Sequence, residues 1–335
     1  MDSAMAKDIQ PITGARVWRR ADVAGKTDWI QRVSTEVCAD LHDAVADARR
    51  RGRDFSNLDF EVYDYASLSA LADDCRAALR HGYGFYLLKG LPFDGVSIDE
   101  LKMMLLVLGH HIGLVGPQFE KPRWIGEVTD TGPGKKHFYY HRGGALPMHM
   151  DPVDVVGLWC VRAAKWGGES GISSSMALHN EILRTRPDLL EILYRGYRHI
   201  RVHDAKNRDT GTVTDHYCPV FCDIGGETIC SFLPSVIEMA YEEGLVKLSP
   251  LEHEALEYLK ELAGSTEFRF DMNFEPGDLQ LLNNRTILHN RLDYEDYPEP
   301  ECRRLLLRLW LTMPGWQKYP PIIPHTDVEL QTEPA

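Results

Sequence analysis

The sequence of 335 residues has no apolar run approaching the roughly 18 residues that a membrane-spanning helix needs. Its first residues, Met1-Asp2-Ser3-Ala4, lack the basic and then apolar profile of a secretory signal. Positive charge is also scarce, because 37 Lys and Arg stand against 50 Asp and Glu, for a net charge of −13. Such a field repels phosphate backbones and anionic lipids, so we expect neither nucleic acid nor membrane as a partner.

Cysteines are few, and no pattern of pairs is visible among them. Their odd number and scattered positions favour free thiols in a reducing compartment over a disulfide framework, and we therefore expect a cytoplasmic protein. The seven are Cys38, Cys75, Cys160, Cys218, Cys222, Cys230 and Cys302. His216, Cys218 and Cys222 suggest zinc by their spacing, but no second Cys/His pair completes four ligands, and we interpret them as core or surface residues.

Internal repeats are absent, and so are linkers rich in glycine, proline or serine. With 44% hydrophobic residues, the chain is long enough to bury roughly three quarters of its unfolded surface. We expect one domain over residues 61–335. Residues 1–60 are charged and weakly patterned, and we expect them to form an N-terminal extension that joins this domain or is partly irregular.

Short strands dominate after residue 115, whereas helical periodicity marks the stretch before it. The pattern predicts a β-rich body with helices packed outside, a mainly β fold with a jelly-roll (double-stranded β-helix) core. The expected helices are 68–79, 98–108, 176–197 and 234–263. The expected strands are 85–88, 155–162 and 305–312, with hairpins of 221–224 with 228–232 around Gly225-Gly226 and of 268–274 with 279–282 around Pro276-Gly277-Asp278.

Fourteen histidines invite a search for metal ligands, and the triplet His-x-Asp/Glu occurs three times, where composition alone predicts about two. His179-Asn180-Glu181 lies in a helical stretch, where residues i and i+2 point apart and cannot chelate one ion. His325-Thr326-Asp327 lies in the proline-rich tail, with no later histidine to add a ligand. We interpret both as ordinary surface residues.

The triplet His149-Met150-Asp151 differs, because it precedes the strand 155–162 in extended chain. There i and i+2 project to the same side, so an imidazole and a carboxylate can share an ion. His289, at the end of the apolar run 286–288, offers a third ligand. Two histidines and one carboxylate leave three open positions on a metal, the arrangement of non-haem Fe(II) oxygenases. A single histidine taken alone is more often a hydrogen-bonded core or loop residue.

The strand 305–312 places leucine at 305, 307, 309 and 311, which form one buried face. Arg304 and Arg308 therefore share the opposite face with Leu306 and Trp310. A buried guanidinium needs an anion, and that anion is either a protein carboxylate or a bound substrate carboxylate held by two hydrogen bonds.

Together these residues resemble the TauD/TfdA family of Fe(II)- and 2-oxoglutarate-dependent dioxygenases. The resemblance runs from about Leu68 to Pro314. It includes the segments HGYGFYLLKGLP (81–92), AAKWGGES (163–170) and EPGDLQLLNNRTILHNR (275–291). It implies a double-stranded β-helix, and Fe(II), 2-oxoglutarate and O₂ as cofactor and co-substrates.

The resemblance also implies a role for individual residues. His149, Asp151 and His289 match the iron ligands. Arg304 matches the arginine that pairs with the distal carboxylate of 2-oxoglutarate, and Ser170 stands where a hydroxyl often helps to hold it. Arg308 matches an arginine that in several members reaches the anionic group of the primary substrate. Asp151 is the carboxylate that related halogenases lack, so halogenation is not expected.

The resemblance predicts oxidation, by default hydroxylation, of an unactivated C–H bond in a small carboxylate-bearing molecule such as an amino acid or natural-product intermediate, with release of succinate and CO₂. Tyr139 and Tyr140, in the loop 135–148, are candidates for contact with this substrate, although an aromatic run near a core is more often packing. Alternatives are desaturation, epoxidation or cyclisation at the same site, a quaternary ammonium substrate, a JmjC-like protein oxygenase and a non-catalytic cupin-like binding protein. A homo-oligomer is possible.

Overall fold

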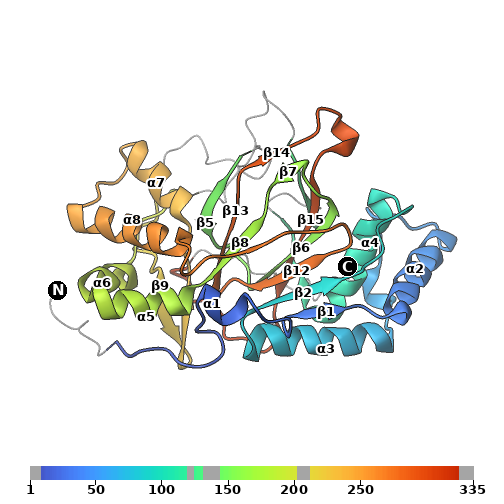
Figure 1. Ribbon diagram of the computed structural model, residues 1–335, viewed down its shortest axis with the longest axis horizontal. Coiled ribbons are helices and arrows are strands. Elements are labelled where there is room, and N and C mark those ends of the chain that lie inside the picture. The colour runs from blue at the N-terminus through green and yellow to red at the C-terminus, as the bar shows by residue number, and fades with distance from the viewer. Residues whose placement is uncertain (1–8, 119–123, 131–143, 202–211, 324–335) are drawn as a thin grey trace.

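Two β-sheets form the centre of the computed structural model, which describes residues 9–118, 124–130, 144–201 and 212–323 (Figure 1). The larger sheet has the order β1 (Ile30–Arg32), β2 (Phe85–Lys89), β12 (Leu279–Asn283), β6 (Val155–Arg162), β15 (Leu305–Thr312) and β3 (Leu114–Val115), and β4 (Ile125–Val128) also pairs with β15. The smaller sheet has the order β11 (Phe270–Met272), β8 (Ser170–Ser174), β13 (Ile287–Arg291) and β5 (Leu146–His149).

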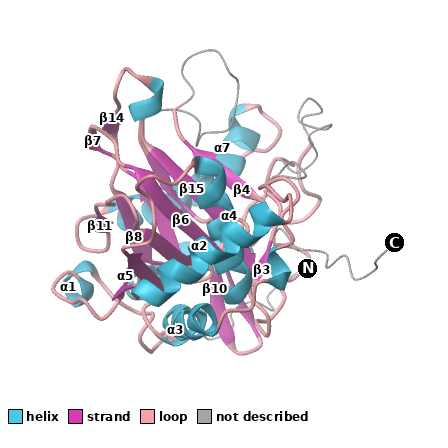
Figure 2. Cartoon of the chain, turned by 90° about the vertical axis from the view of Figure 1, so that its right-hand side faces the viewer, coloured by secondary structure: helices cyan, strands magenta, loops and turns pink. Residues whose placement is uncertain are grey.

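Helices cover the outer faces of both sheets. The helices α2 (Thr35–Arg50), α3 (Ala66–His81) and α4 (Ile98–Ile112) share a buried cluster with the leucine face of β15, and α2 and α4 lie in front of the strands in Figure 2. The helices α5 (Ser175–Thr185), α6 (Pro187–Arg195), α7 (Pro234–Glu242) and α8 (Pro250–Gly264) pack beside the smaller sheet. In the described parts of the chain the remaining helices are α1 (Arg20–Val23) and the 3₁₀ turns Phe60–Val62 and Pro300–Cys302.

A third buried cluster joins the facing sides of the two sheets. It combines Trp310 and Leu306 of β15 with Ile172 of β8, Met272 of β11 and Ile287 of β13. The predicted β-rich core with flanking helices is therefore confirmed. Among the described residues, no helix is long and apolar enough to cross a membrane.

The alternation predicted for strand 305–312 is also confirmed, with bounds that match β15. Its four odd-numbered leucines all face the helical cluster, whereas Leu306 and Trp310 face the space between the sheets. Arg304 and Arg308 are only 4% and 6% exposed. Arg308 on this strand and Arg304 directly before it are therefore two buried cations in the interior of the molecule.

One predicted hairpin is present and the other is wrong. β9 (Phe221–Ile224) and β10 (Glu227–Cys230) pair antiparallel around Gly225 and Gly226, whose φ angles are 57° and 85°. By contrast, β11 pairs with β8 whereas β12 lies between β2 and β6. The turn between them therefore carries the chain from the smaller sheet to the larger one. In this turn Asp278 accepts from the backbone N–H of Glu275 at 3.0 Å and pairs with Lys89 of β2 at 2.8 Å.

The first sixty residues contribute a strand that the sequence pattern did not reveal. β1 pairs in parallel with β2 at the edge of the larger sheet, with Ile30 opposite Leu87. Further toward the N-terminus, the backbone of Ile12 exchanges two hydrogen bonds of 2.8 Å with the side chain of Asn180 on α5. This part of the chain thus packs on both the sheet and the second group of helices.

Candidate metal centre

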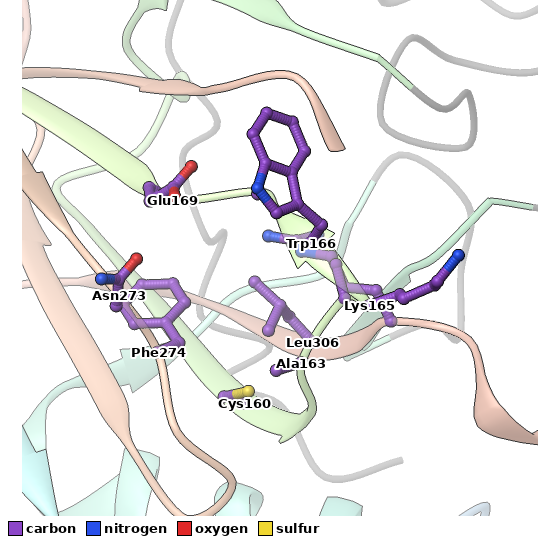
Figure 3. Close-up of a pocket in the computed structure, with 12 residues that line it drawn as sticks. Cys160, Ala163, Lys165, Trp166, Glu169, Asn273, Phe274 and Leu306 are labelled. Atoms are coloured by element: carbon purple, nitrogen blue, oxygen red, sulfur yellow. The ribbon is translucent and has the colours of Figure 1, made fainter. Parts of the chain in front are cut away.

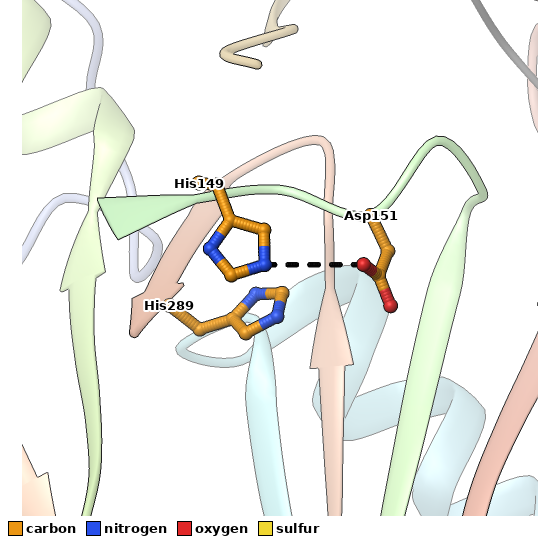
Figure 4. A group of neighbouring side chains, drawn as sticks. All are labelled: His149, Asp151 and His289. Carbon is orange, nitrogen blue, oxygen red and sulfur yellow. Dashed lines mark ion pairs between the residues drawn. The ribbon is translucent and has the colours of Figure 1, made fainter. Parts of the chain in front are cut away.

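His149, Asp151 and His289 meet between the two sheets (Figure 4). His149 ends β5 and lies opposite His289 in the antiparallel register of β5 and β13. Asp151 follows two residues later, where its backbone N–H donates to the side chain of Asn284 at 3.3 Å. One ligand atom from each of the three residues lies within 4.8 Å of the others, and this is the only such group of three or more in the described part of the chain.

Both imidazoles can bind a metal ion through an unprotonated ring nitrogen. Nδ1 of His149 lies 2.8 Å from the carbonyl oxygen of Pro147, which can only accept, so this nitrogen carries the proton and Nε2 is left with a lone pair. Burial lowers the pKa of His289 from 6.5 to about 3, helped by the positive charge that His149 would carry. His289 is therefore neutral at physiological pH, as a metal ligand must be.

Asp151 is an ionised carboxylate. Its burial acts to raise the pKa, but the surrounding groups outweigh this and hold the pKa below its ordinary value. These groups are Arg308, His289, His149 and Trp310. Oδ2 accepts from Nε1 of Trp310 at 2.8 Å and from Nη1 of Arg308 at 3.3 Å, and Oδ1 lies 4.0 Å from Nε2 of His149. Two neutral imidazoles and one anionic oxygen are the donor set that suits a divalent iron with open positions.

A pocket of about 230 Å³ (Figure 3) is lined in part by Arg304. Its walls include Cys160 and Leu306 of the central strands, Phe274, and the segment 163–169. Nη1 of Arg304 is buried and has no hydrogen-bond partner among the described residues. Burial lowers the pKa of Arg304 to about 10, so the group stays cationic at neutral pH. A buried cation with an unused donor fits a bound anion.

The other predicted site residues have different surroundings. Ser170 is buried on β8, where its hydroxyl donates to Gln280 at 2.9 Å, and it does not line the pocket, although its neighbours Gly167, Gly168 and Glu169 do. Arg308 contacts Asp151 instead of the pocket. Tyr139 and Tyr140 lie outside the described residues.

The remaining histidine triplets do not form metal sites in the described structure. His179 lies on α5 as predicted, but the prediction of a surface residue is wrong, because it is fully buried with Nε2 3.0 Å from the hydroxyl of Tyr194. The helical stripe that buries Leu178 and Ile182 carries His179 into the same core. Cys218 is buried with its thiol near Thr214, away from any cluster of ligands. His325 and Asp327 lie outside the described residues.

Sequence reasoning missed three residues of the site. The sequence pattern placed Trp310 on the correct, inner face of its strand but gave it no role in the site, and it did not indicate Gln118 at all. Gln118 is buried and accepts from Nε of Arg308 at 2.9 Å while donating to the backbone oxygen of Arg308 at 2.6 Å. Arg291, two residues after His289, is buried with Nε donating to the carbonyl oxygen of Gly144. Only the alternation of β13, which puts 289 and 291 on one face, could have indicated Arg291.

A family model agrees with this site. The chain matches the model described as "Taurine catabolism dioxygenase TauD, TfdA family" over residues 47–310. It is also 27% identical over 322 residues to the FR-33289 synthase of Streptomyces rubellomurinus, with 93% of each protein covered.

Solved structures share the fold at low sequence identity. An asparagine oxygenase in complex with Fe(II), 2S,3S-3-hydroxyasparagine and succinate superimposes with a TM-score of 0.67 at 15% identity, covering 85% of this chain and 93% of that one. The non-haem iron oxygenase OrfP in complex with Fe, succinate and (3S)-hydroxy-L-Arg gives 0.63 at 11% identity, covering 84% and 94%.

The fold and the metal centre thus define a non-haem iron oxygenase. The chain belongs to the TauD/TfdA family, which confirms the resemblance seen in the sequence, and it is an Fe(II)- and 2-oxoglutarate-dependent dioxygenase. Enzymes of this family use Fe(II), 2-oxoglutarate and O₂.

Proposed function

We propose that the enzyme hydroxylates an unactivated C–H bond of a small, carboxylate-bearing molecule, such as an amino acid or natural-product intermediate, with release of succinate and CO₂. The observation that carries this proposal is the grouping of His149, Asp151 and His289 within 4.8 Å. Support for the substrate class comes from the two structural neighbours, which hold hydroxylated asparagine and hydroxylated arginine beside succinate.

His149, Asp151 and His289 would hold Fe(II), which together with 2-oxoglutarate and O₂ would supply the oxidising chemistry at the C–H bond. The protein contributes the geometry. His289 and Asp151 are buried, whereas the side chain of His149 is 24% exposed and marks the open side of the site. On this assignment the substrate approaches from the side of His149, and the two sheets exclude water from the other side.

Arg304 would pair with the distal carboxylate of 2-oxoglutarate, and its unpartnered Nη1 supports this role. Arg304, which directly precedes β15, and Arg308, which lies on it, are four residues apart, a separation of roughly 13 Å in extended chain. Arg308 contacts Asp151, whereas Arg304 would be free to hold the carboxylate of 2-oxoglutarate that does not bind the iron. Ser170 would assist from β8 if its hydroxyl turned from Gln280. We assign the core of paired sheets to the double-stranded β-helix.

The test is an anaerobic titration of the Fe(II)-loaded protein with 2-oxoglutarate, followed by visible absorption. We expect the weak metal-to-ligand charge-transfer band of a chelated 2-oxo acid. Asp151→Ala and His289→Ala are expected to lose this band and all turnover while remaining folded by circular dichroism. A well-folded, iron-loaded wild-type protein without the band would overturn the proposal, and so would full activity in both variants.

The substrate class has a separate test. Free amino acids and their N-acyl derivatives are supplied with 2-oxoglutarate and O₂, succinate is quantified, and the product is analysed by mass spectrometry. Hydroxylation adds one oxygen atom to the substrate, whereas desaturation or cyclisation removes two hydrogen atoms. The proposed substrate class would be contradicted if none of these compounds stimulated succinate formation and a quaternary ammonium compound or a peptide did.

A further inference from the structure

The second oxygen of Asp151 is held by two donors from one strand. Nε1 of Trp310 donates to Oδ2 at 2.8 Å, and Nη1 of Arg308 donates to the same oxygen at 3.3 Å. Trp310 and Arg308 are two residues apart on β15, so both project to the inner face. Oδ1 remains directed toward His149, at 4.0 Å from Nε2. The two carboxylate oxygens therefore have different surroundings.

Arg308 is itself fixed by a two-point contact with Gln118. Nε of Arg308 donates to Oε1 of Gln118 at 2.9 Å, and Nε2 of Gln118 donates back to the main-chain oxygen of Arg308 at 2.6 Å. The guanidinium also lies over the ring of Trp310, 4.8 Å from its centroid. Arg308 and Trp310, which both donate to Oδ2 of Asp151, therefore also contact each other.

This contact requires a glycine at residue 126. Gly126 of β4 lies opposite Arg308 in the antiparallel register. A Cβ at this position would collide with Oε1 of Gln118 and would lie 3.6 Å from Nε of Arg308. Any larger residue would push the Gln118 amide away from the guanidinium. The strand beside β15 is thus shaped to admit the Gln118 side chain.

We propose that Trp310, supported by Arg308 and Gln118, is a positioning residue that occupies Oδ2 of Asp151, so that only Oδ1 is presented to the metal. A carboxylate that turned to bind through both oxygens would fill a coordination position that 2-oxoglutarate or O₂ needs. This inference rests on the proposed function. It gives Arg308 a role on the metal ligand in place of the predicted contact with the anionic group of the substrate.

The experiment compares two buried tryptophans of the larger sheet. Trp310→Phe removes the donor to Oδ2 and keeps an aromatic ring. The matched control is Trp159→Phe on β6, because Trp159 is equally buried but its Nε1 has no hydrogen-bond partner among the described residues. Binding of Co(II), used in place of Fe(II), is measured by competition with a chelator. We expect Trp310→Phe to weaken Co(II) binding about 10- to 100-fold and the control to leave it unchanged.

The visible spectrum of bound Co(II) supplies a readout that a purely structural role would not move. Loss of the Trp310 donor is expected to weaken the d–d bands, as they weaken when Co(II) gains a ligand, whereas Trp159→Phe is expected to keep the wild-type spectrum. Gly126→Ala is expected to shift affinity and spectrum in the same direction as Trp310→Phe, because it displaces Gln118 and leaves Trp310 in place.

The outcomes separate this inference from the proposed function. A wild-type protein that binds neither Co(II) nor 2-oxoglutarate contradicts the proposed function itself. A wild-type protein that binds both, with a Trp310→Phe variant equal to it in Co(II) affinity and spectrum, overturns only the positioning role. Equal loss in both tryptophan variants also overturns it, since packing would then be the cause. Urea unfolding of each metal-free variant verifies that the compared proteins are folded.

Discussion

At the scale of single residues, two adjacent arginines have opposite surroundings. Arg304 is buried with an unused donor, whereas Arg303 is half-buried and donates to the main-chain oxygens of Pro298 at 3.1 Å and Tyr297 at 3.3 Å. We predict that Arg304→Lys raises the KM for 2-oxoglutarate about 10- to 100-fold, because the lysine keeps the charge but loses the planar pair of donors. The KM for the primary substrate should change far less.

Arg303→Lys is the matched control for this prediction. It makes the same chemical change one residue away, and we expect the KM for 2-oxoglutarate to stay within about twofold of wild type, because the contacts of Arg303 are peripheral. Steady-state succinate formation at varied 2-oxoglutarate measures both variants. An equal rise of KM in the two, or none in Arg304→Lys, would reject the role of Arg304.

The metal ligands could be predicted because their signal is local. His149 and Asp151 are two residues apart in extended chain, and His289 ends an apolar run that forms a strand. The support around them could not be predicted from such patterns. Gln118 lies 190 residues from Arg308 in the sequence, and Trp310 lies 159 residues from Asp151. These partners meet only when β4 and β6 flank β15. A buried indole donor leaves no mark in the sequence, because tryptophan on a core face is ordinary.

At the scale of elements, the turn before β13 is tied to the loop after β5. Asp154 of the loop is 2% exposed and accepts from Nη2 of Arg285 at 2.6 Å and from the backbone of Met313 at 2.8 Å. The backbone of Asn284 donates to the main-chain oxygen of Asp154 at 2.9 Å. The two segments that carry the metal ligands are therefore held together by a buried ion pair.

We predict that Asp154→Asn lowers the free energy of unfolding by about 3–5 kcal/mol, because it leaves the guanidinium of Arg285 buried without its anion. Urea unfolding of the metal-free protein measures the change. Asp188→Asn is the control, since Asp188 pairs with Arg186 on the surface and its loss is expected to shift the midpoint little. Similar effects of both substitutions would show that burial of the pair is unimportant.

The strands that could be predicted differ from those that could not in the same physical way. The alternation of β15 and the Gly-Gly turn of β9 and β10 are local and were predicted correctly. Strand β12 is buried along its whole length, and an unbroken apolar run does not say which strands lie beside it. The hairpin of 268–274 with 279–282 was predicted wrongly because the turn at Pro276-Gly277-Asp278 was taken as evidence that the strands on its two sides pair with each other. β1 was missed because three residues carry too little pattern.

At the scale of the whole molecule, three histidines of the described residues are buried in three different places. His179 lies among the helices, His289 between the sheets, and His199 beside α7, and burial lowers the pKa of each. Each histidine binds a proton more weakly in the folded chain than in the unfolded one. The free energy of unfolding that these neutral histidines contribute is therefore fully present above the unfolded pKa of about 6.5. It is lost as the pH falls from this value toward the lower pKa of the folded state.

His199 allows the clearest test of this pH dependence. It is 2% exposed, both ring nitrogens lack hydrogen-bond partners in the described structure, and burial lowers its pKa from 6.5 to about 4. From these two values, His199 alone should remove about 2 kcal/mol of stability between pH 7.5 and pH 5. We predict that His199→Gln, which cannot be protonated, reduces the loss of unfolding free energy between these two pH values by about this amount.

The readout is the difference between two urea-unfolding experiments on metal-free protein, so any change in absolute stability caused by the substitution cancels. His253→Gln is the control, because His253 is exposed on α8 and its charge does not act on His199, so removing it tests the loss of a histidine without the loss of a buried one. If His199→Gln loses as much stability at pH 5 as wild type, His199 is not a source of the acid sensitivity. The proton that destabilises the fold would then bind at another histidine whose pKa burial lowers, namely His111, His179 or His289, and in the last case added Co(II) should suppress the loss.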